Sequence, residues 1–295
     1  MILLDTNQIM ISNVFAMFGK NNLENLTIND VRHAVLKGIM YFNHRFSKDY
    51  GRMVLCFDST NYWRTKEFKH YKAARKKKQK SGDIDWGKIY GFFSVVKEEI
   101  SENTSFLTMQ IPTLEADDII STICEGYHDR EKILIVSSDK DFQQLQKYGN
   151  VKQYSPAHRD FIVCEDPEHF LIEHIIRGDS SDGIPNVMSD GDTFVTEDKK
   201  QKIMNAKRFN AILDKVNDGS VYDSDYEYNE NYERNERLID LSLIPAGSKT
   251  SVVNAFEMEK SISNKREDST MDYLISNNLK SLLEELDKFG QKIEI

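Results

Sequence analysis

The chain has 295 residues, of which 39% are hydrophobic, 11% aromatic and 29% charged, and its formal net charge is −9. This composition excludes wholesale disorder, and no apolar run approaches the roughly 20 residues that span a bilayer. The amino terminus lacks the basic region and the cleavage site of a signal peptide. We therefore expect a packed cytoplasmic protein that has no membrane partner.

Cysteine and histidine give no sign of a metal site. The three cysteines, Cys56, Cys124 and Cys164, lie far apart in apolar segments without metal-ligand spacing, which predicts small core residues. The seven histidines are scattered along the chain and indicate no ligand cluster.

Strand and helix patterns alternate through the first part of the chain. Three short apolar runs that each end on a carboxylate are predicted to be buried strands: residues 1–5, 53–58 and 132–139. Helical periodicity is present over 29–46, 86–100 and 114–127, and we expect Thr113 to cap the last of these helices. Two further strand-like pieces, 151–154 and 161–164, are predicted to pair as an edge hairpin. This alternation predicts an α/β fold with a central, mainly parallel twisted sheet flanked by helices.

After about residue 165 the predicted elements are all helical: 169–177, 199–216, 229–243, 249–257 and 271–289. We place a domain boundary near residue 175. This gives a catalytic α/β domain over 1–175 and a smaller helical domain over 176–295. Residues 261–269 are the expected linker.

Positive charge is concentrated in one segment of this acidic chain. Residues 61–80 carry nine Lys or Arg against one acid, whereas 218–240 carry eight acids against two arginines. A polyanion responds to the local field, so the basic segment is a candidate nucleic-acid contact. The alternative is an ordinary solvated face.

Carboxylates gather where the predicted strands end. Because the carboxyl ends of parallel strands share one edge of a sheet, we expect Asp5, Asp58 and Asp139 to lie close together. The other acids follow in short motifs: Asp141, the group Glu115, Asp117 and Asp118, and the pair Asp179 and Asp182. Close carboxylates repel one another unless they are protonated or bind cations, and oxygen donors beside a phosphate suit Mg²⁺ or Mn²⁺.

Each acidic motif taken alone is compatible with more than one role. Asp139-Lys140-Asp141 fits a phosphatase-like motif, a calcium loop or a turn. Residues 115–118 fit a helix start that uses acids to complement the helix dipole. Their shared position at one sheet edge favours a common metal site.

These motifs also occur together in a known family. The sequence resembles the 5′-nuclease (flap endonuclease) superfamily, with its PIN-like fold, and most closely the T-even phage RNase H branch. The matching stretches occur in family order: Leu3–Asn7, Cys56–Asp58, Glu115–Asp118, Ser137–Leu145 and Gly178–Pro185.

The resemblance implies a site with two Mg²⁺ ions, for which Mn²⁺ can substitute. The acids that correspond to the first ion and the scissile phosphate are Asp5, Asp58, Glu115, Asp117 and Asp139. Those that correspond to the second ion are Asp141, Asp179 and Asp182, with Asp118, which alternatively serves only the helix dipole.

The resemblance also gives the basic segment a role, as a helical arch over residues 61–85 that guides 5′ ends. Tyr71-Lys72-Ala73-Ala74-Arg75 is similar to the family's arch pattern, so Lys72 and Arg75 are expected to hold phosphate during catalysis. The nucleic-acid contacts that we expect are Arg64, Lys66, Lys69, Tyr71, Lys72, Arg75 and Lys76. Trp63 is expected either to stack on bases or to anchor the arch on the core.

Together these features imply a metal-dependent 5′→3′ exonuclease and flap endonuclease, a phosphodiester hydrolase acting on DNA and RNA–DNA duplexes. The family implies primer removal in replication, a monomer, and partners such as a single-strand-binding protein or a sliding clamp. One alternative is a PIN-type ribonuclease, which should lack both the arch and the Asp179–Asp182 pair. The other is an inactive structure-specific binding protein, which should have lost some of the acids.

Overall fold

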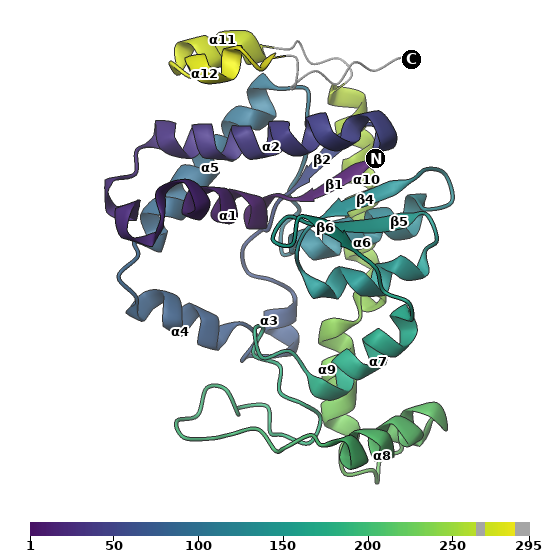
Figure 1. Cartoon of the computed structure of the whole chain (residues 1–295). Helices are drawn as coiled ribbons and strands as arrows, with labels where there is room; N and C mark the ends of the chain where they lie inside the picture. The colour runs from purple at the N-terminus through teal and green to yellow at the C-terminus, as the bar shows by residue number, and fades with distance from the viewer. Residues whose placement is uncertain (264–268, 287–295) are drawn as a thin grey trace.

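A computed structural model of the chain describes residues 1–263 and 269–286, and for Asn21, Lys76, Lys78, Lys80 and Ser81 it describes the backbone only (Figure 1). Part of the expected linker, 264–268, and the end of the last predicted helix, 287–289, lie outside the described residues.

Six strands form one sheet in the order β3-β2-β1-β4-β5-β6, with only β6 antiparallel to its neighbour. The strands are β1 (Ile2–Asp5), β2 (Met53–Cys56), β3 (Leu107–Met109), β4 (Ile133–Val136), β5 (Val151–Ser155) and β6 (Asp160–Ile162). Leu4 pairs with both Leu55 and Val136, so the carboxyl ends of the three central strands are level. The predicted mainly parallel sheet and its edge hairpin are confirmed, whereas β3 was not predicted.

Helices cover both faces of the sheet. Successive side chains of β1 point to opposite faces and all are apolar from Ile2 to Leu4, so both faces must be covered. Ile2 and Leu4 point into a core formed with α1 (Thr6–Phe18), α2 (Ile28–Tyr50) and α5 (Trp86–Asn103). Leu3 points to the opposite face, which α6 (Ala116–Tyr127) and α10 (Ala246–Ser263) cover (Figure 1).

Two short helices near the end of the described chain pack on the first core. Residues of α11 (Thr270–Ser276) and α12 (Lys280–Leu283) join the first core, beside α2. Short 3-10 turns connect other elements: η1 (Lys20–Asn25), η2 (Lys140–Lys147), η3 (Ser220–Tyr222) and η4 (Leu241–Leu243). Among residues 1–263 and 269–286, every helix is too short or too polar to cross a lipid bilayer.

A third core lies under the basic segment. Helices α7 (Pro167–Arg177), α8 (Ala206–Asn217) and α9 (Asn229–Ile239) pack around Ile176 and Tyr232, with Phe68 and Tyr71 contributed by the segment between β2 and α5. That segment contains two short helices, α3 (Arg64–Glu67) and α4 (Ala73–Ser81). The expected boundary at residue 175 falls inside α7.

Two predicted helix starts are wrong for local reasons. Thr113 adopts a left-handed φ of 67°, whereas an N-cap needs extended backbone, and the cap of α6 is Glu115. The helix predicted from residue 199 begins only at Ala206, where the side chain of Asn205 accepts from the backbone N–H of Arg208.

The acidic turn after α7 depends on glycine. Gly178 has a φ of 69°, and a Cβ there would lie 2.4 Å from the carbonyl oxygen of Ile184. Asp179 and Ile184 then pair across the turn. The carbonyl of Asp182 accepts from the backbone N–H of Lys72 at 2.7 Å, which attaches this turn to the arch segment.

Candidate active site

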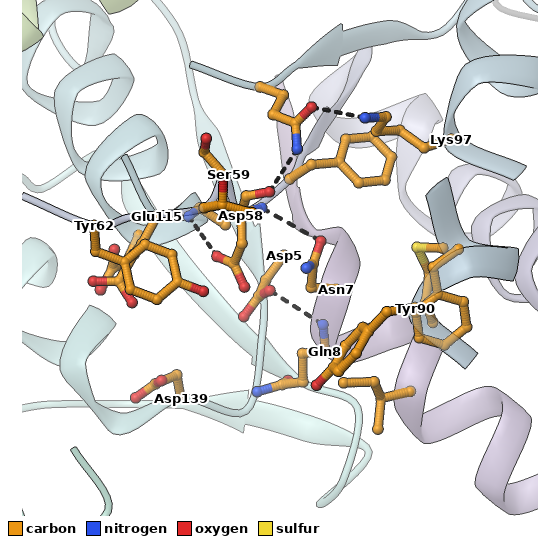
Figure 2. Close-up of a pocket in the computed structure, with 18 of the residues that line it drawn as sticks. Asp5, Asn7, Gln8, Asp58, Ser59, Tyr62, Tyr90, Lys97, Glu115 and Asp139 are labelled. Atoms are coloured by element: carbon orange, nitrogen blue, oxygen red, sulfur yellow. Dashed lines mark hydrogen bonds between the residues drawn. The ribbon is translucent and has the colours of Figure 1, made fainter. Parts of the chain in front are cut away.

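Asp5 and Asp58 lie side by side where β1 and β2 end. The Oδ2 atom of Asp5 accepts from Ser137 Oγ at 2.9 Å, and Oδ1 of Asp58 accepts from the backbone N–H of Ala116 at 2.8 Å. Figure 2 shows both carboxylates directed into the same pocket, with Asp139 beneath them. Burial, and then the charge of Asp58, raise the pKa of Asp5 to about 7.

The pocket has a volume of about 680 Å³ and is lined by both acidic and basic side chains. The predicted residues that line it are Asp5, Asp58, Glu115, Asp117, Asp139, Lys72 and Arg75. The acids assigned to the second ion do not line it. Lys66 and Lys69 are exposed elsewhere on the arch segment, and the side chain of Lys76 is outside the described side chains.

A second carboxylate group begins α6. Glu115, Asp117 and Asp118 place one oxygen each within 4.8 Å of one another. Asp118 is fully buried and accepts from the backbone N–H of Glu115 at 3.0 Å and from Trp63 Nε1 at 3.1 Å. Trp63 therefore anchors the segment between β2 and α5 on the core, and Asp118 holds the start of α6.

Arg64 lies inside the protein beneath this group. Its Nη1 is 3.0 Å from Glu115 and 2.9 Å from Asp118, and its Nε donates to the carbonyl of Leu238 at 2.9 Å. Only 1% of Arg64 is exposed, so its guanidinium cannot reach a bound strand. We therefore reassign Arg64 from nucleic-acid contact to the support of the acids.

Tyr71 and Lys72 connect the carboxylate group at the start of α6 to the turn after α7. The Tyr71 hydroxyl lies 2.8 Å from Oε2 of Glu115 and 3.1 Å from Oδ2 of Asp182. Lys72 forms ion pairs with the same two acids. Burial lowers the pKa of Lys72, but the charges of Asp182 and Glu115 outweigh it and raise that pKa. Tyr71 is also buried, so its ring is not a stacking surface.

A third group surrounds His174, which sequence reasoning missed. His174 Nε2 lies 3.1 Å from Asp179 Oδ2, and its Nδ1 lies 3.4 Å from Asp141 Oδ1. Contrary to the expectation for the histidines, His174 forms a candidate ligand group with Asp141 and Asp179, whose ligand atoms lie within 4.8 Å of one another. The signal was the position of His174 five residues before Asp179, on the helix that leads into the acidic turn.

Two other residues that position the acids were missed. Asn7 accepts from the backbone N–H of Asp58 at 3.4 Å, and Gln8 accepts from that of Ser138 at 2.6 Å. They tie the residues that follow β2 and β4 to the start of α1, and Figure 2 shows the contact between Asn7 and Asp58. Both lie at the start of α1, in or next to the Leu3–Asn7 motif.

The donor set fits divalent cations. Burial is the main cause that raises the pKa of each of Asp5, Asp58, Asp117, Asp141 and Asp182. Neighbouring acids raise these pKa values further, whereas Arg64 lowers that of Asp117 and Lys72 lowers those of Asp58 and Asp182, so the nearby cations offset the burial only in part. Oxygen-rich, partly buried sites of this kind suit hard cations. An acid-lined pocket at the carboxyl edge of a parallel sheet, with Lys72 and Arg75 in the same lining, is the arrangement of a metal-dependent phosphodiester hydrolase.

Comparison with known proteins agrees with this class. Residues 1–171 match the family model of the 5′-3′ exonuclease N-terminal resolvase-like domain, and residues 166–289 match that of the T4 RNase H C-terminal region. The chain belongs to the 5′-3′ exonuclease family. The predicted family and enzyme class are confirmed.

The matches to the phage T4 relative and to the solved structures span most of the chain. It is 32% identical over 267 residues to ribonuclease H of Enterobacteria phage T4, covering 88% of this chain and 86% of that protein. It is 30% identical over 150 residues to a 5′-3′ exonuclease of Buchnera aphidicola, covering 48% and 49%. The T5 D15 protein co-crystallised with metal ions shares the fold at a TM-score of 0.61 and 18% identity, covering 92% of this chain and 97% of that one. A T5 D15 flap endonuclease complex with DNA and metal ions gives 0.63 and 19%, covering 89% and 98%.

Proposed function

We propose that this protein is a divalent-metal-dependent 5′→3′ exonuclease and flap endonuclease that removes RNA primers during replication. The observation that carries the proposal is the single pocket that Asp5, Asp58 and Glu115 line together with Lys72 and Arg75. The substrates are DNA and RNA–DNA duplexes with 5′ ends or flaps. The names of the relatives, a ribonuclease H and a flap endonuclease bound to DNA, support this substrate class.

The acids are proposed to hold two Mg²⁺ ions, with Mn²⁺ as a substitute. The first ion would be held among Asp5, Asp58, Glu115, Asp117 and Asp139, and the second near Asp141, Asp179 and Asp182. When bound, such ions activate a water and stabilise the leaving oxygen of a phosphodiester.

The basic side chains of the pocket lining are proposed to position the substrate. The Arg75 side chain is exposed and lines the pocket, so it is free to bind a phosphate through two N–H groups. Lys72, paired with Glu115 and Asp182, holds positive charge next to the acids.

We assign catalysis to residues 1–175 and duplex contact to the helical residues 176–295. Lys207 and Arg208 are exposed on α8. In Figure 1, α8 lies below the sheet, as do α3 and α4 of the arch segment. We also infer a cytoplasmic monomer that works beside replication proteins such as a single-strand-binding protein or a sliding clamp, an inference that rests on the family.

The test is gel-resolved digestion of 5′-labelled flap, nicked and RNA-primed duplexes in Mg²⁺, with matched 3′-flap duplexes and the Asp58→Asn variant as controls. We expect cleavage near the 5′ junction, which EDTA and the variant abolish. Binding without turnover would instead support the inactive binding protein. Cleavage confined to single-stranded RNA would support the PIN-type ribonuclease.

A further inference from the structure

Two buried polar atoms face each other without a hydrogen bond. His174 Nδ1 and Asp141 Oδ1 are 3.4 Å apart, and neither atom has a hydrogen-bond partner among the described residues. His174 is 5% exposed and lies in α7, which packs against the turn η2 that carries Asp141. A buried acceptor without a partner is unfavourable, so something that both atoms can bind belongs between them.

Asp179 cannot be that partner, because its two oxygens are already engaged. Oδ1 accepts from the backbone N–H and the hydroxyl of Ser181, at 2.8 and 2.5 Å. Oδ2 contacts His174 Nε2 at 3.1 Å and Lys140 Nζ at 3.0 Å. Asp179 therefore contacts the other ring nitrogen, Nε2, and orients the imidazole.

This arrangement sets the tautomer of His174. An ionised carboxylate only accepts, so Nε2 carries the proton that it donates to Asp179, and in the neutral ring Nδ1 keeps its lone pair. Metal-binding histidines commonly donate their second ring N–H to a carboxylate in this way. Oδ1 of Asp141 lies 3.4 Å from His174 Nδ1.

We propose that His174 Nδ1 and Asp141 Oδ1 bind one divalent cation, and that this mixed nitrogen and oxygen site takes a first-row transition ion such as Mn²⁺ in preference to Mg²⁺. Two adjacent ligands about 2.1 Å from an ion lie about 3.0 Å apart in an octahedron and about 3.4 Å apart in a tetrahedron, so a small approach of the two side chains would complete an octahedral site. Mg²⁺ favours all-oxygen ligands, whereas imidazole suits transition ions. The place of this ion in the reaction rests on the proposed function, but the site itself does not.

A protonated His174 that bridges Asp141 and Asp179 would fill the same gap without a metal. Pulsed electron paramagnetic resonance distinguishes the two arrangements, since an imidazole ligand adds ¹⁴N modulation to the Mn²⁺ echo. The sample is the full chain with two Mn²⁺ per protein, beside His174→Asn and His128→Gln. His128 is the matched control because its Nδ1 also pairs with a carboxylate, that of Asp129 at 3.1 Å, away from any candidate metal group.

We expect ¹⁴N modulation in the wild type and in His128→Gln and none in His174→Asn. Titration should show that His174→Asn weakens one Mn²⁺ site at least about tenfold, with a smaller change for Mg²⁺. A wild-type spectrum without ¹⁴N modulation, or one that His174→Asn leaves unchanged, overturns the inference. The wild-type spectrum decides even if the variant fails to fold. Loss of the proposed function would appear separately, as absence of flap cleavage in Mg²⁺.

Discussion

The guanidinium of Arg64 lies 2.9 Å from the carboxylate of Asp118, and both side chains are buried. The same guanidinium contacts Glu115, and its Nε binds the carbonyl of Leu238 at the end of α9. One cation thus joins the base of the arch, the start of α6 and the helical region. Burial lowers the pKa of Arg64, but the charges of Asp118 and Asp117 raise it by more than burial lowers it, so Arg64 stays charged.

Removal of this cation should destabilise the whole fold. Arg64→Met removes the guanidinium that pairs with buried Asp118 and leaves Glu115 with Lys72 as its cation, and we expect the free energy of unfolding to fall by about 3–5 kcal/mol. Lys66→Met, an exposed neighbour in α3, should change it by less than about 0.5 kcal/mol. Urea denaturation in EDTA measures both values. Equal stability of the two variants would show that the Arg64 ion pairs are not structural.

Stability without metal should fall as the pH rises from 5 to 7. The raised pKa of Asp5, about 7, means that the folded state keeps a proton that the unfolded chain has already lost. Asp117 and Asp141 shift in the same direction, whereas the lowered pKa values of Glu115 and Asp179 act below this window. Thermal unfolding in EDTA across this range gives the slope.

Divalent ions should oppose that loss. An ion at a hundredfold excess over its Kd stabilises the folded state by about 2.7 kcal/mol, so millimolar Mg²⁺ should raise the Tm most at pH 7 and above. Asp5→Asn should reduce the slope measured in EDTA. A melting temperature that is constant or increases from pH 5 to 7 in EDTA would contradict the shared origin of these pKa shifts.

Regular local patterns predicted much of the fold and of the acidic site. The apolar runs that end at Asp5 and Asp58 lie in the centre of the sheet, because consecutive buried residues fit a strand covered on both faces. Contacts between residues that are far apart in the sequence could not be predicted from such local patterns. The basic neighbours of Arg64 in sequence are typical of a surface cation, whereas its partners lie about 50 and about 170 residues further along the chain.

The contact between His174 and Asp141 is a second example of a relation that local patterns did not predict. No spacing motif connects it to Asp141, and only the packing of α7 on η2 brings the two together. Thr113 was a plausible cap by residue type. Its backbone is left-handed, so Glu115 is the N-cap instead, and this places a carboxylate at the start of α6.

Loss of charge at the central acids should separate turnover from binding. Asp58→Asn keeps an oxygen that can accept from the backbone N–H of Ala116, so the start of α6 should persist. We expect single-turnover cleavage to fall at least about 10²-fold for Asp58→Asn and Asp117→Asn, with DNA affinity equal or higher because repulsion of phosphate decreases. Asp182→Asn should be milder.

Asp49→Asn is the matched control, because Asp49 is exposed at the end of α2. It should cleave at the wild-type rate. If Asp58→Asn cleaves within about tenfold of the wild type, Asp58 does not hold a catalytic ion.

The cations of the arch should divide into two functional groups. Lys72 and Arg75 line the pocket, and they should hold the phosphate beside the scissile bond mainly in the transition state. Lys72→Ala with Arg75→Ala should therefore lower the single-turnover rate of 5′-flap cleavage by about 10²-fold, more than it weakens binding. Neutralising Lys76, Lys77 and Lys78 should instead weaken affinity and flatten its salt dependence, since those charges only attract the polyanion. A salt series on both variants makes the comparison, and a double variant that loses affinity alone would contradict this division.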